Sequence, residues 1–278
     1  MPQGKVESPT MGSEEWLVEI FGLTSEVRVS QKIPKKTLME MGAGGRGGKK
    51  LVQELIGELR WVASLQPSNT GLPGIKGDTD SAHEIEVIWG RLRSEPARPS
   101  MLRDLTSQIH RSIPYPIVLA MTSAAAWVEM SIAIPAGIES GMADRSSQDH
   151  LLVVRLDDGA LAHSESERGL STFRLGKLPR ISVADLYVGW FDRLLSLAIT
   201  QRTGVFGLSK SNRETMTRFE AFSNCIELEA EIHALKSKAT KAKQIRTRSD
   251  LNLELRRKTL ELKECQSLLA GSASARLE

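Results

Sequence analysis

Cysteine is scarce in this sequence, and no segment has the features of an export signal. The two cysteines, Cys225 and Cys265, exclude a disulfide-dense secreted scaffold and a zinc site made of four cysteines. Residues 1–15 are polar and lack both the basic start and the apolar run of a signal peptide. We therefore expect a cytoplasmic protein whose two thiols are reduced.

Long apolar runs are also missing. The longest uncharged run, residues 112–128, is interrupted by Pro114 and Pro116 and is followed by Glu129. A helix that crosses a bilayer needs about 20 consecutive apolar residues, so this run is too short and too broken. Apolar residues make up 40% of the chain and aromatic residues 5%, which is typical of a globular protein without a membrane segment.

The usual catalytic and metal-binding motifs do not occur in the sequence. There is no G-x-S-x-G, the pattern that a nucleophile elbow requires. His83 and Glu84 are not followed by a second histidine at position 87, and the five histidines show no metal-ligand spacing. We expect no metal and no cofactor.

A glycine cluster is the segment most similar to a nucleotide-binding motif. Residues 42–47 read G-x-G-x-x-G. In a dinucleotide-binding fold this pattern follows a strand, and an acidic residue stands about 20 positions later. Here a helix-like segment precedes the glycines, and Gln66, Pro67 and Ser68 stand where the acid belongs. We interpret the cluster as a flexible linker, with a phosphate or nucleic-acid contact as the alternative.

A divergent nuclease, or another nucleic-acid-processing enzyme with a non-standard active site, is the catalytic alternative. Common restriction nucleases hold magnesium with an acid and an Asp/Glu-x-Lys motif on a strand. The one such motif here, at residues 261–263, lies in a predicted C-terminal helix. The acids of predicted strands, Glu84, Glu86 and Glu129, lack the lysine. This alternative requires the three acids to converge with a basic residue around a cleft.

Composition divides the chain into three parts. Residues 1–48 form an N-terminal extension with a short helix after Ile33 and the glycine-rich linker. Residues 49–207 form a core domain, and residues 208–278 form a C-terminal helical hairpin.

Hydrophobic periodicity gives the elements of the core. It predicts helices at residues 49–65, 100–112 and 186–199, the last capped by Ser182 with Asp185. Strands are expected at residues 84–92, 116–121, 127–134 and 151–156, with short ones at 26–29 and 170–175. Residues 66–81 are expected to form a loop and residues 157–159 a turn. Because strands follow one another without intervening helices, we expect an α+β fold with a mixed or antiparallel sheet and flanking helices.

Two heptad-like seams define the C-terminal part. One seam has spacings of 3, 4, 3, 4 and 3 and contains Cys225, Leu228, Ile232, Leu235, Ala239 and Ala242. The other has spacings of 4, 3, 4, 3 and 4 and contains Leu251, Leu255, Lys258, Leu262, Cys265 and Leu269. The repeat breaks between them, at Ser249 and Asp250, so we favour an antiparallel coiled-coil hairpin over one continuous helix in a parallel dimer. In the hairpin Ile232 faces Lys258, and Leu235 faces Leu255.

The same part carries the clearest functional signals. Residues 208–270 hold 13 Lys and Arg against 9 Asp and Glu. Six cations lie within 13 residues that contain no acid: Lys236, Lys238, Lys241, Lys243, Arg246 and Arg248. They represent either a solvated coiled-coil face or a sequence-independent, salt-sensitive contact with DNA or RNA. For docking a partner helix we expect the seam residues Leu228, Ile232, Leu235, Leu251, Leu255 and Leu262.

Several segments resemble those of a known family. They are residues 33–36 (IPKK), 58–65 (ELRWVASL), 84–87 (EIEV), 113–118 (IPYPIV) and 249–255 (SDLNLEL). Together these resemble the prokaryotic domain-of-unknown-function family 4391. The resemblance implies an accessory product of gene clusters that carry Swi2/Snf2-type helicases and DNA methyltransferases, linked to restriction and phage defence. We therefore expect a non-catalytic adaptor with a helicase or methyltransferase partner; a homodimer is a further expectation.

Overall fold

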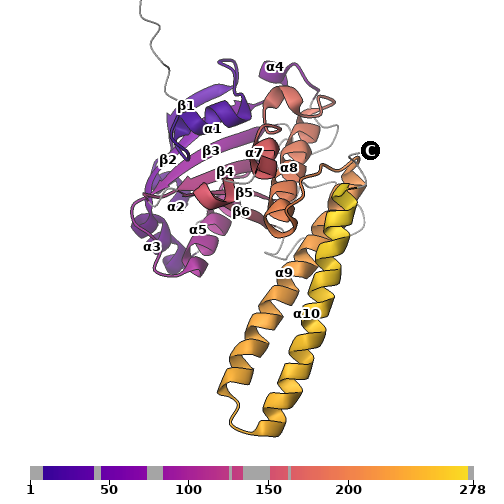
Figure 1. The fold of residues 1–278 in the computed structure, drawn as a ribbon. Helices are drawn as coiled ribbons and strands as arrows, with labels where there is room; N and C mark the ends of the chain where they lie inside the picture. The colour runs from indigo at the N-terminus through magenta and orange to yellow at the C-terminus, as the bar shows by residue number, and fades with distance from the viewer. Residues whose placement is uncertain are drawn as a thin grey trace, which may run out of the picture. The chain divides into compact units, whose positions relative to one another are not determined.

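The computed structural model describes residues 9–40, 45–73, 84–124, 127–133, 151–161 and 164–274. The chain divides into two compact units, Met1–Leu194 (unit 1) and Leu195–Glu278 (unit 2). Unit 1 is built around a β-sheet, and most of unit 2 is a pair of long helices (Figure 1). The boundary falls inside helix α8, Val183–Thr203. In the described part of the chain, no helix is long and apolar enough to cross a membrane.

The described strands of unit 1 form one six-stranded sheet in which they lie side by side in chain order (Figure 1). They are β1 Arg28–Lys32, β2 Ile56–Leu65, β3 Ile85–Leu92, β4 Ile117–Thr122, β5 Trp127–Ala133 and β6 Leu151–Asp157. All neighbours are antiparallel except β3 and β4, which are parallel. Parallel neighbours need a crossover connection, and helix α5, Pro99–Ser112, supplies it. The predicted α+β class with a mixed sheet is confirmed.

One face of the sheet packs against helices α2 (Lys35–Glu40), α3 (Gly45–Leu55) and α5. Leu105 of α5 belongs to the same buried cluster as Ile88 of β3 and Leu119 of β4. Neighbouring residues of a strand point to opposite faces, so Val118 points away from α5, yet it is also buried. β4 is therefore covered on both faces, as its nearly pure apolar run predicts.

The N-terminal residues help to cover the opposite face. Trp89 of β3 points away from α5 and donates its Nε1 hydrogen to the carbonyl oxygen of Gly12 at 2.7 Å, just before helix α1, Glu14–Phe21. The Phe21 ring lies 5.0 Å from the ring of Trp190 and 5.7 Å from that of Phe173. Residues 9–40 thus contribute two helices and a strand to unit 1, instead of forming an extension beside the core.

The predicted helix over residues 49–65 is wrong in its second half. Helix α3 ends at Leu55, and residues from Ile56 onward form β2, which pairs with β1 and with β3. Leu55, Leu59 and Val62 fit a helical period, but hydrogen bonding to two neighbouring strands outweighs that local preference. The glycines at positions 45–48 form the start of α3 instead of a linker; residues 41–44 lie outside the described residues.

Smaller elements also differ from the predictions. The expected turn at residues 157–159 is the end of β6 and the start of α6, Asp158–Leu161. The expected strand at 170–175 is replaced by the end of α7, Ser164–Leu170, and the 3₁₀ turn Leu175–Lys177. The expected loop after β2 begins with the short helix α4, Pro67–Thr70. These are short segments in which a few apolar residues cannot distinguish strand from helix.

The cap of α8 is confirmed. The Ser182 hydroxyl accepts the backbone hydrogen of Asp185 at 3.2 Å and donates to the Asp185 carboxylate at 2.6 Å. This arrangement satisfies a backbone donor that the first turn of a helix leaves free. The predicted strands 84–92, 116–121, 127–134 and 151–156, and the helix 100–112, are confirmed to within a residue or two; residue 134 lies outside the described residues.

Unit 2 contains the predicted antiparallel hairpin. Helices α9, Asn212–Lys241, and α10, Ile245–Ser274, are joined by a turn at residues 242–244 (Figure 1). The turn precedes the predicted break at Ser249 and Asp250. The apolar repeat stops where the two helices no longer pack against each other. Its loss therefore locates the closed end of the hairpin, but it does not show which residues form the turn.

Candidate functional site

The six predicted cations lie together at the closed end of the hairpin. Three come from the last turns of α9, one from the connecting turn and two from the first turns of α10: Lys236, Lys238, Lys241, Lys243, Arg246 and Arg248, here called the basic tip. All six are exposed. A helix rises about 1.5 Å per residue, so each lies within about 10 Å of the turn along its helix axis. The structure thus brings all six predicted residues to one place.

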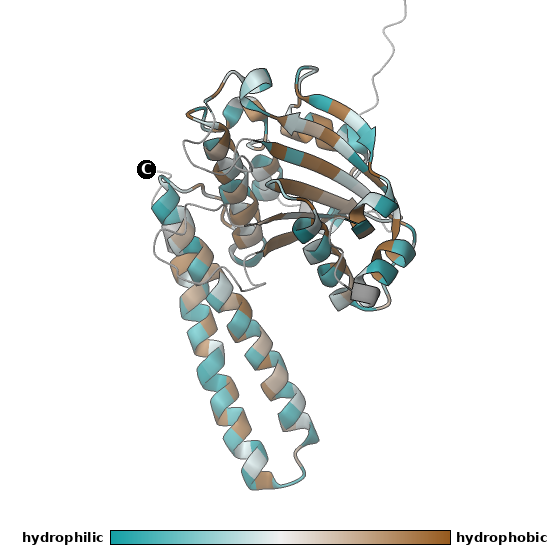
Figure 2. Cartoon of the chain, turned by 180° about the vertical axis from the view of Figure 1, so that it is seen from behind, coloured by the Kyte–Doolittle hydropathy of each residue, from teal (hydrophilic) through white to brown (hydrophobic). Residues whose placement is uncertain are grey.

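No acid offsets the charge of the basic tip. Within the described residues, no carboxylate forms an ion pair with any of the six cations. Lys238 and Lys241 also lie in the last turn of α9, where the partial negative charge of the helix end favours cations. The tip is therefore a concentrated positive surface on a polar arm; Figure 2 shows both arms mostly teal and the central strands mostly brown.

The predicted docking seam is used inside the hairpin. Leu228, Ile232 and Leu235 of α9 are buried. Their counterparts Leu251, Leu255 and Leu262 of α10 are half-buried. The six residues therefore hold α9 and α10 together, and the incompletely covered side chains of α10 form an apolar edge along the hairpin.

A lysine occupies the centre of this seam. The Lys258 ammonium lies 2.8 Å from the Glu231 carboxylate and 3.3 Å from that of Glu261. Hydrogen bonds to Glu231 and then to Glu261 raise the pKa of Lys258. The pairing of Lys258 with residue 231 agrees with the predicted register, in which Lys258 faces Ile232.

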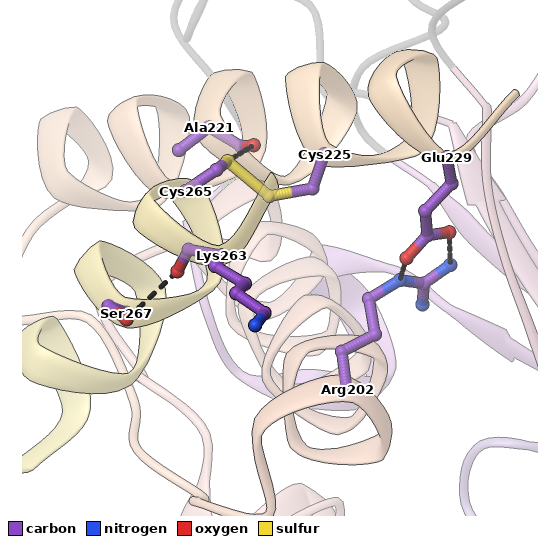
Figure 3. The surroundings of a disulfide bond; sticks show 7 residues. All are labelled: Arg202, Ala221, Cys225, Glu229, Lys263, Cys265 and Ser267. Atoms are coloured by element: carbon purple, nitrogen blue, oxygen red, sulfur yellow. Dashed lines mark hydrogen bonds and ion pairs between the residues drawn. A yellow bond between two sulfur atoms is a disulfide. The ribbon is translucent and has the colours of Figure 1, made fainter. Parts of the chain in front are cut away.

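A disulfide bond confirms that register and corrects the expectation of reduced thiols. Cys225 of α9 is joined to Cys265 of α10, with Cα atoms 6.2 Å apart (Figure 3). One heptad along α9 from Cys225 is Ile232, and one heptad back along α10 from Cys265 is Lys258. Reduced thiols were expected because the chain has only two cysteines and was expected to be cytoplasmic. The positions of Cys225 and Cys265 in the two seams, however, put them opposite each other in the predicted register.

Polar contacts attach the end of α8 to α9 within unit 2. Arg202 forms two hydrogen bonds with the Glu229 carboxylate, at 3.2 and 3.3 Å (Figure 3), and its guanidinium lies 4.8 Å from the centre of the Phe222 ring. The buried Arg218 donates to the Gly207 carbonyl at 2.7 Å and to the Ser209 hydroxyl at 2.9 Å. These contacts attach the base of the hairpin to the end of α8 and to residues 207–209.

Two of the three acids of the nuclease hypothesis lie together in unit 1. Glu84 accepts hydrogen bonds from the Ser64 hydroxyl, at 2.7 Å, and from the Gln66 amide. The neighbouring Glu86 is only 3% exposed, and burial, followed by the hydrogen bond and charge of Glu84, raises the pKa of Glu86 to about 8. Burial of Glu84 acts in the same direction, but hydrogen bonds from Ser64, Gln66 and Glu86 lower its pKa overall. The two carboxyl groups therefore share one proton near neutral pH.

The third acid does not join them. Glu129 of β5 lies opposite Met121 of β4, whereas Glu86 of β3 lies opposite Ile117 of β4. The two acids are thus two strands and four residues apart on the same face, about 16 Å at ordinary sheet spacings. Glu129 instead pairs with Arg155 of β6 at 3.3 Å. Burial raises the pKa of Glu129, while the charge of Arg155 opposes that shift. The acids and the cation do not form a single centre.

A half-buried histidine that contacts the sheet was missed by the sequence reasoning. His110 of α5 places its Nε2 atom 2.9 Å from the Ser131 hydroxyl of β5, and burial lowers the pKa of His110 to about 3. The ring is therefore neutral and acts as a structural hydrogen-bond partner. The residues near His110 in the sequence did not indicate this contact, because its partner Ser131 lies 21 positions away, on a different element. Among the described residues, no group of three His, Cys, Asp or Glu side chains is arranged to hold a metal ion.

Gly47, the last glycine of the G-x-G-x-x-G segment, and the neighbouring Gly48 line a groove between α3 and α5. Its volume is about 590 Å³. The charged residues in its lining are two cations, Lys50 and Arg111, and two acids, Glu54 and Asp104, so their formal charges cancel. Such a neutral lining gives no preference for an anion such as phosphate.

Comparison with known proteins gives one match. A family model with the description "Domain of unknown function (DUF4391)" matches residues 21–262 of the 278. No curated protein and no solved structure matches the chain.

Proposed function

This chain belongs to the DUF4391 family, and from that starting point we propose that it is a non-catalytic accessory protein of a prokaryotic DNA restriction or phage-defence system. In this proposal the basic tip binds nucleic acid without sequence preference, and the hairpin docks a helicase or DNA methyltransferase. The single observation that carries the nucleic-acid part is the exposed tip itself, with six cations and no acid.

The chemistry of the tip favours the phosphate backbone over the bases. Lys and Arg bind phosphate by charge, and the gain comes from counterions that the nucleic acid releases. No aromatic residue occurs between residues 223 and 278, so the tip has no ring on which a base can stack. Binding of this kind is independent of sequence and becomes weaker as salt is added.

The docking part of the proposal is supported by the half-buried edge of the hairpin. Two-helix arms leave one side of their seam open, and a third helix completes it by inserting its own apolar residues. Leu251, Leu255 and Leu262 of α10 are the side chains available for this contact. That the partner is a helicase or a DNA methyltransferase is an expectation that comes from the family resemblance alone.

Fluorescence anisotropy with two unrelated DNA duplexes, a single strand and an RNA tests the nucleic-acid part. The four probes are expected to bind with similar affinity at low salt. Replacing Lys241 and Arg246 by Glu removes two phosphate contacts, which corresponds to a loss of about 60-fold at 0.1 M salt, and it reduces the steepness of the salt dependence by about 2. Both side chains are exposed, so the fold is expected to persist.

A matched control separates the tip from net charge. Lys36 and Lys177 are exposed lysines of unit 1, and their replacement by Glu changes the charge by the same amount. This control is expected to leave binding nearly unchanged. If the tip variant binds as tightly as the unmodified protein at low salt, the proposed nucleic-acid role is wrong.

Co-purification tests the docking part. The full chain is expressed with a candidate helicase or DNA methyltransferase. The variants Leu251→Ser and Leu255→Ser are compared with Ile245→Ser, a change at an exposed apolar residue of the tip. Only the first two variants are expected to lose the partner. If all three variants recover the partner equally and keep the helical circular dichroism of the unmodified protein, the apolar edge of α10 is not the docking surface.

A further inference from the structure

Helix α10 carries a second regular stripe on its outer face. Leu253, Arg257, Leu260, Glu264 and Leu268, here called the outer stripe, follow one another at spacings of 4, 3, 4 and 4. At about 100° per residue they fall within an arc of about 80°, roughly 140° around the helix from the seam that faces α9. All five are exposed, and the three leucines are 62%, 61% and 72% exposed.

Isolated exposed leucines are common on protein surfaces, but a heptad-like row of them is not. The same spacing on the other side of α10 is covered by α9, which shows that this helix packs through such rows. The outer stripe therefore has the pattern of a helix–helix interface, and its exposed leucines are available to a second helix.

The charges of the outer stripe select its partner. In an antiparallel pair of identical helices centred near Leu260, Leu253 lies opposite Leu268 of the second copy, and Arg257 lies opposite Glu264 of the second copy. Two-fold symmetry repeats both contacts. In a parallel pair Arg257 would meet Arg257 and Glu264 would meet Glu264, so like charges exclude that arrangement. We propose that the outer stripe joins two copies of this chain as an antiparallel dimer of their α10 helices.

The size of the stripe sets the strength of the dimer. Three leucines from each copy, with the stems of Arg257 and Glu264, form an interface at the low end of those found in specific complexes. We therefore expect a dissociation constant in the range of about 1–100 µM, so that monomer and dimer exchange at ordinary concentrations.

The dimer would also place two basic tips at opposite ends of the paired helices. Ile245 lies 15 residues from Leu260 along α10, which is about 22 Å, so the tips would be about 45 Å apart. This consequence rests on the proposed function: a duplex longer than about 13 base pairs could then contact both tips of one dimer.

Sedimentation velocity on the full chain without nucleic acid tests the dimer separately from DNA binding. The average mass is expected to rise from 30.6 kDa towards twice that value as the concentration increases. Leu260→Gln removes two leucines from each dimer and is expected to weaken it about 100-fold. Ile226→Gln, a comparable change at an exposed isoleucine of α9, is the matched control and is expected to leave the dimer unchanged.

Charge exchange makes the test specific for the antiparallel arrangement. Arg257→Glu and Glu264→Arg each place like charges opposite each other and are expected to weaken the dimer about tenfold or more. The double variant, and an equimolar mixture of the two single variants, are expected to restore it. A chain that stays monomeric up to about 200 µM, a dimer insensitive to Leu260→Gln, or a double variant that fails to recover would each overturn the proposal.

Discussion

The disulfide between Cys225 and Cys265 is expected to be a main source of stability for the hairpin. The two residues are separated by 40 positions, and the bond closes that loop in the unfolded arm as well as in the folded one. In the chain-entropy model, closing a loop of this length raises the free energy of unfolding by about 4 kcal/mol. Reduction of the bond removes that contribution while the rest of the seam stays in place.

The chain contains its own reporters for this experiment. All five tryptophans, Trp16, Trp61, Trp89, Trp127 and Trp190, belong to unit 1, whereas α9 and α10 contribute a large share of the helical circular dichroism. In urea, with an m-value of about 1–2 kcal/mol/M for a segment of this size, reduction is expected to lower the midpoint of the helical transition by about 2–4 M. The tryptophan transition is expected to move much less.

Access to the bond gives a second observable. Cys225 is fully buried and Cys265 is 8% exposed, so a reductant must wait until the hairpin opens. Reduction is expected to be slow in buffer and to accelerate in low urea. Equal midpoints for the oxidised and reduced proteins would refute the reasoning, as would two thiols found by titration in air-purified protein. The replacement of both cysteines by Ala should match the reduced protein.

Three further changes test the described contacts. Glu86→Gln removes the carboxyl group whose pKa is raised. Because of that raised pKa, the unmodified protein is expected to lose a few kcal/mol of stability as the pH rises from about 4.5 to about 8, whereas the variant is expected to show a flat profile in thermal melts over that window. A parallel loss of stability in both proteins would contradict the pairing of Glu86 with Glu84. Arg218→Met removes the charged group that donates to the Gly207 carbonyl and to the Ser196 and Ser209 hydroxyls, although the carbonyl keeps its hydrogen bond from Ser196. This variant is expected to lower the stability of unit 2 by about 3 kcal/mol in urea, with little change in tryptophan fluorescence. Ser182→Ala removes the cap of α8 and is expected to cost about 1 kcal/mol; no shift in melting temperature would mean that water replaces the hydroxyl.

The sequence was most informative where a pattern has one structural solution. The apolar run before Met121 predicted a buried strand, and the two seams after Cys225, with the break between them, favoured a hairpin over one continuous helix; the structure has both features. The facing of Ile232 and Lys258 followed from the spacing of the two seams, because matching their apolar positions in antiparallel order fixes which residues face each other even though the turn begins earlier than the predicted break. The basic tip was found for the same reason: six cations without an acid stand out in any conformation.

Local patterns failed where partners far along the chain decide the outcome. Leu51, Leu55, Leu59 and Val62 have a helical spacing, but from Ile56 onward two neighbouring strands supply hydrogen bonds that no local pattern includes. The contact of His110 with Ser131, and the separation of Glu129 from Glu86, depend on strand order, which the sequence did not specify. The nuclease hypothesis named the right kind of residues but assumed a convergence that the sheet does not produce.

Strand β1 has a consequence for how this protein can associate. As an edge strand it exposes backbone groups that could pair with another chain, which is a common route to aggregation. Its register against β2 shifts between Arg28 and Gln31, and Ser30 between them has a φ of 49°. Arg28 and Lys32 place positive charges at its ends. This irregular, charged border is a poor template for intermolecular strand pairing, so β1 is protected from adding a strand of another molecule to this edge of the sheet.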